Sequence, residues 1–449
     1  MITETNTDRW IDATGCLRWG PQNPTGVPRV EMKIAAAALS HPDFKLAYLD
    51  RTFGVYRPCT DEDIAHLREL VDIFEAPQTS ADLAFYWRNR ASVIKNFEAE
   101  TGRNIAALLT KKPTRKGMIY TIAKTGVRAL VNGAKLIYRS TGWLPFAGKT
   151  SQAIPSKSAL LISHIVDRRE MCSRAITRQE LYTRYMVHDI IPLKEPETHP
   201  ARMVAGFRRW LLRAGEEKAA LICVSKGTAD DVNAWYALQD GATLPAAVNV
   251  CALTGVGLRV DGPTEPVDAL VQRKFALYIS TFNPRKNHDF LVEVWARLID
   301  ELGEDQVPEL VLIGRDKPYK ALVAALERHP LAAAKVRNLG SVSNETLRWA
   351  YQNCAFVVFP SSAEGWGIGV TEALRFGKPA IHTDTPQLNE AGHGLMPALP
   401  DRDLDRWTAQ VSSWLNDEKN IEPFRLAAQK LDETDNKAFE TCVLSALKA

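Results

Sequence analysis

The sequence predicts an α/β protein with two domains, each built on a parallel sheet that helices cover on both faces. Short apolar runs alternate with helical patterns along most of the 449 residues, which is typical of repeated strand–helix–strand units. The chain is also longer than chains that fold around a single hydrophobic core usually are. A segment with two prolines, a glycine and three acids at 259–270 is the best candidate for the linker between the domains.

The alternation is clearest in the second half of the chain. The strands expected there are FALYIS (275–280), ELVLIG (309–314), VRNLG (336–340), AFVVFP (355–360) and KPAIHTD (378–384). The helical patterns between them lie at 287–302, 319–329, 344–353 and 370–377. In the first half the rhythm is looser, with a helix at 27–39 and strands at 9–14, 45–50, 185–192, 220–225 and 248–253. These elements predict two Rossmann-like domains in tandem.

The domain boundaries follow from this rhythm. We expect a first domain at 1–265, a second at 266–425, and a C-terminal helix at 426–449 that packs back on the first domain. Residues 78–157 do not follow the alternation and predict a largely helical insertion in the first domain.

Composition and charge exclude several classes of protein. The chain is 45% hydrophobic and 24% charged with a net charge of +3, which is ordinary globular composition and gives no argument for nucleic acid. Its seven cysteines are scattered without a CxxC pair, which predicts reduced core thiols, no zinc site and no disulfide framework. The polar N-terminus is not a signal peptide, and no run approaches the roughly 20 apolar residues of a spanning helix. We expect a cytoplasmic protein, either soluble or peripheral on the inner membrane face.

The segment after the strand at 355–360 carries the strongest chemical pattern. Glu364 and Glu372 lie eight residues apart with three glycines between them. Ligands of open α/β sheets bind at this edge, glycines let main-chain N–H groups approach a ligand, and a helix N-terminus favours anions. A carboxylate such as Glu372 can accept two hydrogen bonds from a vicinal diol such as a ribose. The alternative is a glycine-rich turn in which Glu372 only complements the helix dipole.

The whole string SSAEGWGIGVTEALRFGKPAI resembles the EX7E signature of retaining glycosyltransferases of family 4, of the bacterial polysaccharide-biosynthesis type. This family has the GT-B fold, in which two Rossmann-like domains face each other across a cleft. The resemblance is strong over about 272–395 and weaker in the first domain. It implies that Glu364 contacts the donor sugar and Glu372 the ribose. It also implies that main chain holds sugar hydroxyls and phosphate oxygens at Gly365, Trp366 and Gly367.

Arg285 and Lys286 follow the strand at 275–280 and begin the next helix. Such a pair is usually surface charge, but here it resembles the diphosphate-binding pair of the family, which stabilises the leaving group. Many members carry a further arginine where this chain has Ser280, and Arg285 is the residue expected to take over its role. No DxD motif lies in a suitable loop, so we expect neither a metal nor a cofactor.

Three further positions are assigned to the cleft by the resemblance. The segment around Val342 matches the one whose main chain contacts the nucleobase, although a plain strand-to-helix turn explains it equally well. Gly26, just before a helix with proline in its first turn, is expected near the donor phosphates. His188 ends a buried strand where members often have a histidine that touches the donor sugar, against the alternative of a structural histidine.

A basic segment distinguishes the first domain. Residues 101–166 contain no acid, and within them Lys124, Arg128, Lys135 and Arg139 fall on one face of a helical pattern opposite an apolar face. This predicts a helix on an anionic membrane surface or at the acceptor. Packing of the apolar face on the domain, with solvated cations, is the alternative. RNA is a third reading, but the aromatic residues do not interleave with the charges.

Together these features predict a retaining, metal-independent hexosyltransferase. It would move a hexose, mannose or a deoxyhexose, from a nucleoside diphosphate sugar to a glycan or lipid-linked acceptor in surface polysaccharide biosynthesis. The first domain would then bind the acceptor and the second the nucleotide sugar. The alternatives are a sugar-nucleotide epimerase or a hydrolase of the same fold, and a non-catalytic subunit that binds a sugar nucleotide.

Overall fold

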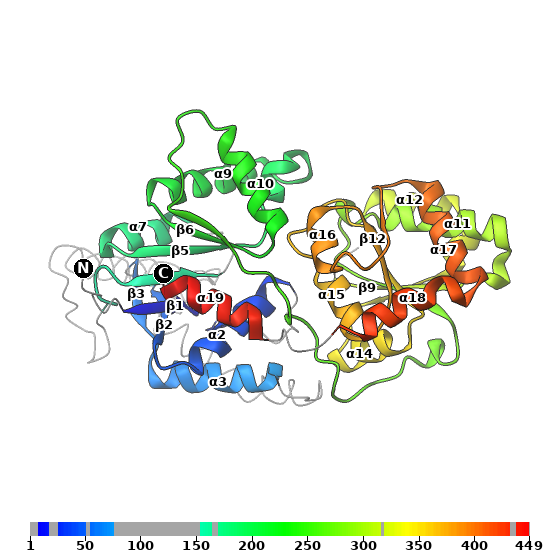
Figure 1. The fold of residues 1–449 in the computed structure, drawn as a ribbon, viewed down its shortest axis with the longest axis horizontal. Coiled ribbons are helices and arrows are strands. Elements are labelled where there is room, and N and C mark those ends of the chain that lie inside the picture. The colour runs from blue at the N-terminus through cyan, green and yellow to red at the C-terminus, as the bar shows by residue number, and fades with distance from the viewer. Residues whose placement is uncertain are drawn as a thin grey trace, which may run out of the picture.

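The computed structural model describes residues 8–17, 26–50, 54–75, 153–163, 169–315, 318–431 and 437–448. Within these residues the chain forms two α/β domains that lie side by side (Figure 1). The first contains a seven-stranded sheet and the second a six-stranded sheet. The predicted fold class of two parallel-sheet domains is therefore confirmed.

The first sheet has the strand order β3-β2-β1-β4-β5-β6-β7. Its strands are β1 (Arg9–Asp12), β2 (Phe44–Asp50), β3 (Val55–Pro58), β4 (Ala159–Ile162), β5 (Tyr182–Val187), β6 (Ala220–Cys223) and β7 (Ala247–Val250). Neighbouring strands run parallel except β2 and β3, which are antiparallel. Strand β3 and the central strand β4 were not predicted from the sequence. The run of β4 is only four residues long and directly follows the expected insertion, so it carried no alternation of its own.

Strand β5 ends at Val187, five residues before the end of the strand predicted at 185–192. The chain leaves the sheet after Val187 because Asp189 Oδ1 accepts a hydrogen bond from the Ile191 main-chain N (3.0 Å), which turns it into a short helix. The helices of this domain are α1 (Thr14–Leu17), α2 (Val27–Leu39), α3 (Asp61–Glu75), α7 (Arg169–Gln179), α8 (Ile191–Lys194), α9 (Ala201–Glu216), α10 (Lys226–Ala237) and the 3-10 turn η1 (Pro196–Thr198).

Helices α2 and α10 begin with clear local signals and reach towards the second domain. Gly26 precedes α2 with φ +59°, a left-handed value that favours glycine, and Pro28 lies in the first turn. Ser225 caps α10, because its side chain accepts a hydrogen bond from the main-chain N of Thr228 (2.9 Å). Both helices therefore start at defined positions at the edge of the sheet.

The second sheet has the order β10-β9-β8-β11-β12-β13 and is parallel throughout. Its strands are β8 (Phe275–Ile279), β9 (Glu309–Ile313), β10 (Val336–Gly340), β11 (Phe356–Phe359), β12 (Ala380–Thr383) and β13 (Ala398–Leu399). Strands β9, β11 and β12 are buried along their whole length, as a sheet covered on both faces requires. The strand order reverses between β8 and β11, and sheets of this topology bind ligands at such a switch point.

The helices of the second domain cover both faces of this sheet. They are α11 (His288–Leu302), α12 (Lys320–Arg328), α13 (Pro330–Lys335), α14 (Asn344–Asn353), α15 (Ile368–Arg375), α16 (Pro386–Ala391), α17 (Leu404–Asn416) and α18 (Glu418–Gln429), with 3-10 turns η2 (Asp268–Leu270), η3 (Pro284–Lys286) and η4 (Glu304–Gln306). Helix α11 buries Phe290 and Trp295 in the core. The connection between the domains is held on α14, where Arg348 donates hydrogen bonds to the carbonyl oxygens of Arg259 (3.1 Å) and Pro263.

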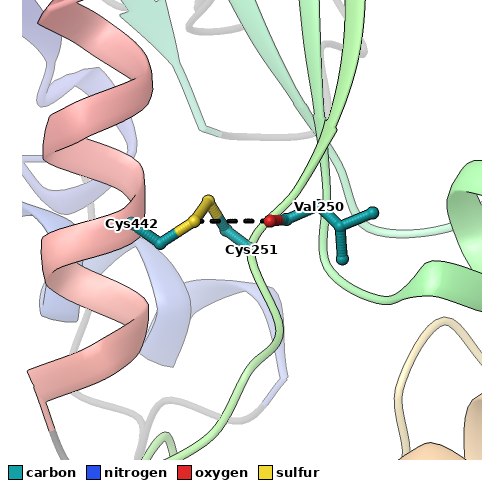
Figure 2. Close-up of a disulfide and its surroundings, with 3 residues drawn as sticks. All are labelled: Val250, Cys251 and Cys442. Carbon is teal, nitrogen blue, oxygen red and sulfur yellow. Dashed lines mark hydrogen bonds between the residues drawn. A yellow bond between two sulfur atoms is a disulfide. The ribbon is translucent and has the colours of Figure 1, made fainter.

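The C-terminal helix α19 (Ala438–Lys448) packs on α2 and β4 of the first domain (Figure 1). Lys33 on α2 forms an ion pair with Glu440 (2.9 Å), and Arg184 on β5 donates a hydrogen bond to the carbonyl oxygen of Ala446 (2.9 Å). A disulfide joins Cys442 on α19 to Cys251, next to the end of β7 (Figure 2). The prediction of uniformly reduced thiols is therefore wrong for this pair, whose members lie 191 residues apart and are brought together only by the fold.

None of the helices in the described parts of the chain is both long and apolar enough to cross a bilayer.

Candidate functional site

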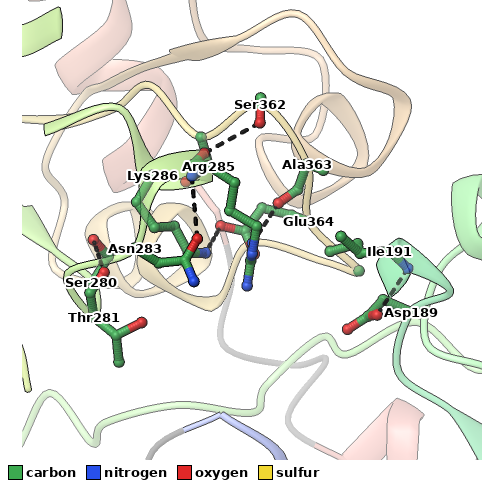
Figure 3. A network of polar contacts seen from close by, with 12 residues as sticks. Asp189, Ile191, Ser280, Thr281, Asn283, Arg285, Lys286, Ser362, Ala363 and Glu364 are labelled. Atoms are coloured by element: carbon green, nitrogen blue, oxygen red, sulfur yellow. Dashed lines mark hydrogen bonds and ion pairs between the residues drawn. The ribbon is translucent and has the colours of Figure 1, made fainter. Parts of the chain in front are cut away.

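Two loops meet at the switch point of the second sheet. The loop after β8 leads into η3, and the loop after β11 leads into α15. The carbonyl oxygen of Arg285 accepts hydrogen bonds from the main-chain N of Ser362 (2.9 Å) and from its hydroxyl (3.3 Å; Figure 3), which ties the loops together. Asn283 caps η3 by accepting from the main-chain N of Arg285 (3.1 Å). The two loops therefore present their side chains as one unit.

This unit holds a carboxylate between two cations. Lys286 Nζ forms an ion pair with Glu364 Oε1, and Arg285 Nη1 lies 3.6 Å from Glu364 Oε2 (Figure 3). Arg285 also donates a hydrogen bond to the carbonyl oxygen of Ala363 (2.6 Å). The side chains of Lys286 and Glu364 are 8% and 12% exposed, and that of Arg285 is 20% exposed. Two cations and one carboxylate leave a net positive charge at the switch point.

The charges of the cluster are set by burial and by mutual attraction. Burial opposes ionisation of Glu364, but Lys286 and Arg285, with hydrogen bonds from Lys286 and Ser361, hold its pKa below the ordinary value. Burial also lowers the pKa of Lys286, an effect that Glu364 counteracts. Glu364 is therefore a carboxylate at neutral pH. It can accept hydrogen bonds from hydroxyl groups, and it holds no proton to donate.

Ser280, which replaces the additional arginine of the family pattern, contributes no charge. Its hydroxyl lies 3.0 Å from Nε2 of His288. Burial, and then the charge of Lys286, lower the pKa of His288 to about 3, so the imidazole is neutral. The positive charge of this loop is therefore carried by Arg285 and Lys286.

Glu372, on α15, is only 3% exposed and joins three segments of the chain. Its Oε2 accepts a hydrogen bond from the hydroxyl of Tyr351 (2.8 Å), and its Oε1 accepts from the main-chain N of Leu258 (2.6 Å). Oε1 also forms an ion pair with Arg29 of α2, in the first domain. A Cβ atom at Gly257 would lie 2.9 Å from Cγ of Glu372, so the linker backbone packs directly on this side chain.

Arg29 was not identified from the sequence. At the start of α2 the sequence pointed only to Gly26 and its approach to the cleft. The signal that could have found Arg29 is its place in the first turn of α2, beside a loop already assigned to the cleft.

Gly365 is a contact point between the domains. A Cβ atom there would lie 1.7 Å from the carbonyl oxygen of His188, so only glycine allows this approach. The carbonyl oxygen of Gly365 accepts hydrogen bonds from the hydroxyls of Ser225 (2.7 Å) and Thr228 (3.1 Å). His188 is buried beside it with Nε2 2.7 Å from the carbonyl oxygen of Ser163, and Asp189 lies on the loop that faces Glu364 (Figure 3).

The other predicted positions lie around the same edge of the sheet or at the facing domain. Trp366 is buried and donates a hydrogen bond to the hydroxyl of Thr371 (2.8 Å). Gly367 precedes α15 with φ +116°, where a Cβ atom would lie 2.5 Å from Cδ2 of Leu388. Val342 lies between β10 and α14, half-buried. Gly26 starts α2 with open space where a Cβ atom would be.

A further interdomain contact lies between α10 and α16 and was also not predicted from the sequence. The carboxylate of Glu390 accepts hydrogen bonds from the main-chain N atoms of Lys226 (2.9 Å to each oxygen) and Gly227 (3.3 Å), at the first turn of α10. Gln387 donates a further hydrogen bond to Asp231 (2.8 Å). An acid in α16 therefore complements the helix N-terminus of the other domain.

The basic face predicted for the insertion, at Lys124, Arg128, Lys135 and Arg139, lies outside the described residues and stays a prediction. Among the residues that the structure describes, no group of three or more His, Cys, Asp or Glu side chains is arranged to hold a metal ion.

Comparison with known proteins places this site in a family. Residues 266–431 match the family described as "Glycosyl transferases group 1". The chain is 29% identical over 217 residues to the serotype-specific mannosyltransferase WbdA of Escherichia coli, which is 46% of this chain and 26% of that protein. It is 28% identical over 181 residues to the O-antigen chain mannosyltransferase B of Escherichia coli, which is 40% of this chain and 46% of that protein. The chain thus covers between about a quarter and a half of these relatives.

A solved structure extends the comparison to the whole chain. The fold matches the crystal structure of Anabaena Alr3699/HepE in complex with UDP and glucose, with a TM-score of 0.54 and 13% identity, over 98% of this chain and 99% of that one. The two parallel-sheet domains have the GT-B fold that the resemblance implied. The second domain is a group 1 glycosyltransferase domain.

Proposed function

We propose that this chain is a retaining, metal-independent hexosyltransferase that uses a nucleoside diphosphate sugar as donor. The observation that carries the proposal is the cluster of Arg285, Lys286 and Glu364 at the switch point of a group 1 glycosyltransferase domain. A buried lysine and a partly buried arginine bind a diphosphate strongly, because charge-assisted hydrogen bonds gain strength away from water. The similarity to two mannosyltransferases supports mannose as the hexose.

In the proposed reaction the bond between the anomeric carbon and the diphosphate oxygen breaks, and the acceptor hydroxyl attacks on the same face. The acceptor proton passes to the departing diphosphate oxygen, so the enzyme supplies no base. Lys286 and Arg285 stabilise the charge that develops on the leaving group. Glu364, held as a carboxylate by these cations, accepts hydrogen bonds from hydroxyls of the sugar and orients it.

The donor is tested first by binding. Thermal-shift screening of the full chain against GDP-, UDP-, dTDP- and ADP-sugars should give stabilisation by one nucleotide class, with GDP-mannose the expected donor. Stabilisation by none of them would contradict the proposal. The acceptor, a glycan or a lipid-linked saccharide of surface polysaccharide biosynthesis, is then sought with the stabilising donor.

The roles of the cluster are tested by substitution. Lys286→Ala should lower kcat by about 100-fold or more, as expected when a group that stabilises developing charge is lost. Lys419→Ala, on the exposed side of α18, is the matched control and should leave kcat unchanged.

Glu364→Gln should lower kcat without trapping a sugar on the protein. A mass increase of one hexose on the intact, unaltered protein after incubation with donor would instead indicate a double displacement through an enzyme carboxylate.

The same assays separate the alternatives. Conversion of the donor sugar without an acceptor would indicate an epimerase, and cleavage of a free glycoside would indicate a hydrolase. A non-catalytic subunit would bind the nucleotide sugar with no turnover in either assay.

A further inference from the structure

The carboxylate of Glu372 is already occupied by groups of the protein itself. Oε1 receives two donors, the main-chain N of Leu258 (2.6 Å) and the guanidinium of Arg29, and Oε2 receives the hydroxyl of Tyr351 (2.8 Å). A carboxylate offers about four lone-pair positions over its two oxygens. The three donors therefore leave one acceptor position, on Oε2, and none on Oε1.

A ribose diol needs more than this. Its two neighbouring hydroxyls donate to a carboxylate side by side, one to each oxygen, so Oε1 has to lose a donor before Glu372 binds the diol. This step rests on the proposed function, together with the ribose-binding role that the family resemblance implies for Glu372.

The three donors differ in how easily they can leave. Tyr351 is fully buried and its ring stacks on Phe376, with centroids 4.9 Å apart and planes at 10°. Leu258 donates from the main chain, next to Gly257, whose backbone packs on Glu372. Arg29 comes from the other domain on a long side chain that is 13% exposed. Arg29 is thus the donor that can be exchanged without disturbing the core of the second domain.

We propose that Arg29 is a positioning residue of the donor site. It holds the carboxylate of Glu372 in the protein without donor and is displaced from Oε1 by the ribose diol. Nucleotide binding then breaks the ion pair between Arg29 of α2 and Glu372 of α15. Occupation of Glu372 by Arg29 in this way weakens the apparent affinity for any nucleotide with an intact ribose.

The proposal is tested by isothermal titration of the full chain with GDP, UDP and their 2′,3′-dideoxy counterparts. Arg29→Ala should lower the Kd of the ribonucleotide that binds by about tenfold, the equivalent of one hydrogen bond to a charged group. The Kd of the dideoxy nucleotide should not change, because it has no diol to compete with Arg29. Arg29→Gln, which keeps the size and removes the charge, should give a gain in the same direction.

Two controls separate this effect from a general change in the structure. Lys33→Ala removes an ion pair from the same helix, with Glu440 on α19, and should leave every Kd unchanged. In a Glu372→Gln background, Arg29→Ala should no longer tighten binding. In turnover assays Arg29→Ala should lower KM for the donor without a matching loss of kcat, which a merely destabilised protein would not do.

The contrary results are distinct. An unchanged or higher Kd in both Arg29 variants would overturn the proposal, and so would an equal gain for ribo- and dideoxy nucleotides. If the unaltered protein binds none of these nucleotides and is also not stabilised by any of the GDP-, UDP-, dTDP- and ADP-sugars, the proposed function fails and the inference fails with it.

Discussion

At the scale of single residues, the charge state and the contacts of a buried carboxyl group depend on the hydrogen-bond donors and charges around it. Glu364 meets two cations and stays ionised, whereas Glu372 meets a hydroxyl, a main-chain N–H and a guanidinium. Glu31 on α2 has a different environment. Burial, followed by the charge of Asp12, raises its pKa to about 8. The backbone of Gly15 packs closely on this carboxyl group, because a Cβ atom at Gly15 would lie only 2.0 Å from Oε2 of Glu31. Glu31 is therefore protonated at neutral pH in the folded protein.

Glu31 predicts a pH dependence of stability. Its pKa is raised on folding, from 4.5 to about 8, so the folded state binds a proton that the unfolded state has released. The free energy of unfolding should therefore fall as pH rises between these two values, by at most about 1.4 kcal/mol per pH unit from this group. In Glu31→Gln this decline should be reduced, as measured by urea unfolding at several pH values. A decline of the same size in the variant would contradict the assignment.

At the scale of elements, the contacts between the domains are made by helix ends and by loops that follow strands. The first turn of α10 points at α16, where Glu390 accepts from its main-chain N–H groups. The loop after β5 brings the carbonyl oxygen of His188 against Gly365. In both places main-chain groups of one domain meet the other domain, so these contacts depend directly on the backbone positions of both domains.

Glu390 gives the prediction at this scale. Glu390→Ala removes the acid that caps α10 from the second domain, and caps of this kind contribute about 1 kcal/mol. We expect the domains to separate more often, which small-angle X-ray scattering would report as a larger radius of gyration. Glu293→Ala, on α11 and in an exposed pair with Arg328, is the control and should leave the radius unchanged. An unchanged radius in Glu390→Ala would show that this contact does not hold the closed arrangement.

At the scale of the whole molecule, the first domain includes a helix that comes from beyond the second domain in the sequence. Helix α19 follows the second domain in sequence but packs on α2 and β4, and the disulfide between Cys251 and Cys442 attaches it there. Helix α19, which follows the second domain in the sequence, is thus part of the first domain. The stability of that domain depends on this helix as well as on its own core.

The disulfide predicts a redox dependence of stability. A cross-link over 191 residues removes entropy from the unfolded chain and is expected, from loop-closure entropy alone, to stabilise by about 5 kcal/mol. Dithiothreitol should lower the melting temperature of the unaltered protein by several degrees. Cys442→Ser should melt at the lower temperature with or without reductant, and Cys354→Ser, at a free buried thiol, should keep the response to reductant. A melting temperature that does not respond to dithiothreitol would contradict the role of the disulfide, and peptide mapping without reduction would reveal the bond itself.

Local patterns in the sequence determined much of this protein. The alternation of apolar runs and helical patterns predicted five of the six strands of the second domain and the helices α11, α12, α14 and α15, because buried parallel strands and amphipathic helices each carry a recognisable period. The spacing of Glu364 and Glu372 and the pair Arg285–Lys286 located one edge of that domain. The short central strand β4 had no such period and was missed.

Only the tertiary structure decided which distant residues meet. The ion pair of Arg29 with Glu372, the cap that Glu390 provides for α10, the fit of Gly365 against His188, and the disulfide of Cys251 with Cys442 all join segments far apart in the chain. The hydrophobic period of a helix or strand does not predict such pairs, because it depends only on the residues of that one element. They depend on how the two domains and the C-terminal helix pack, and that packing is a property of the whole chain.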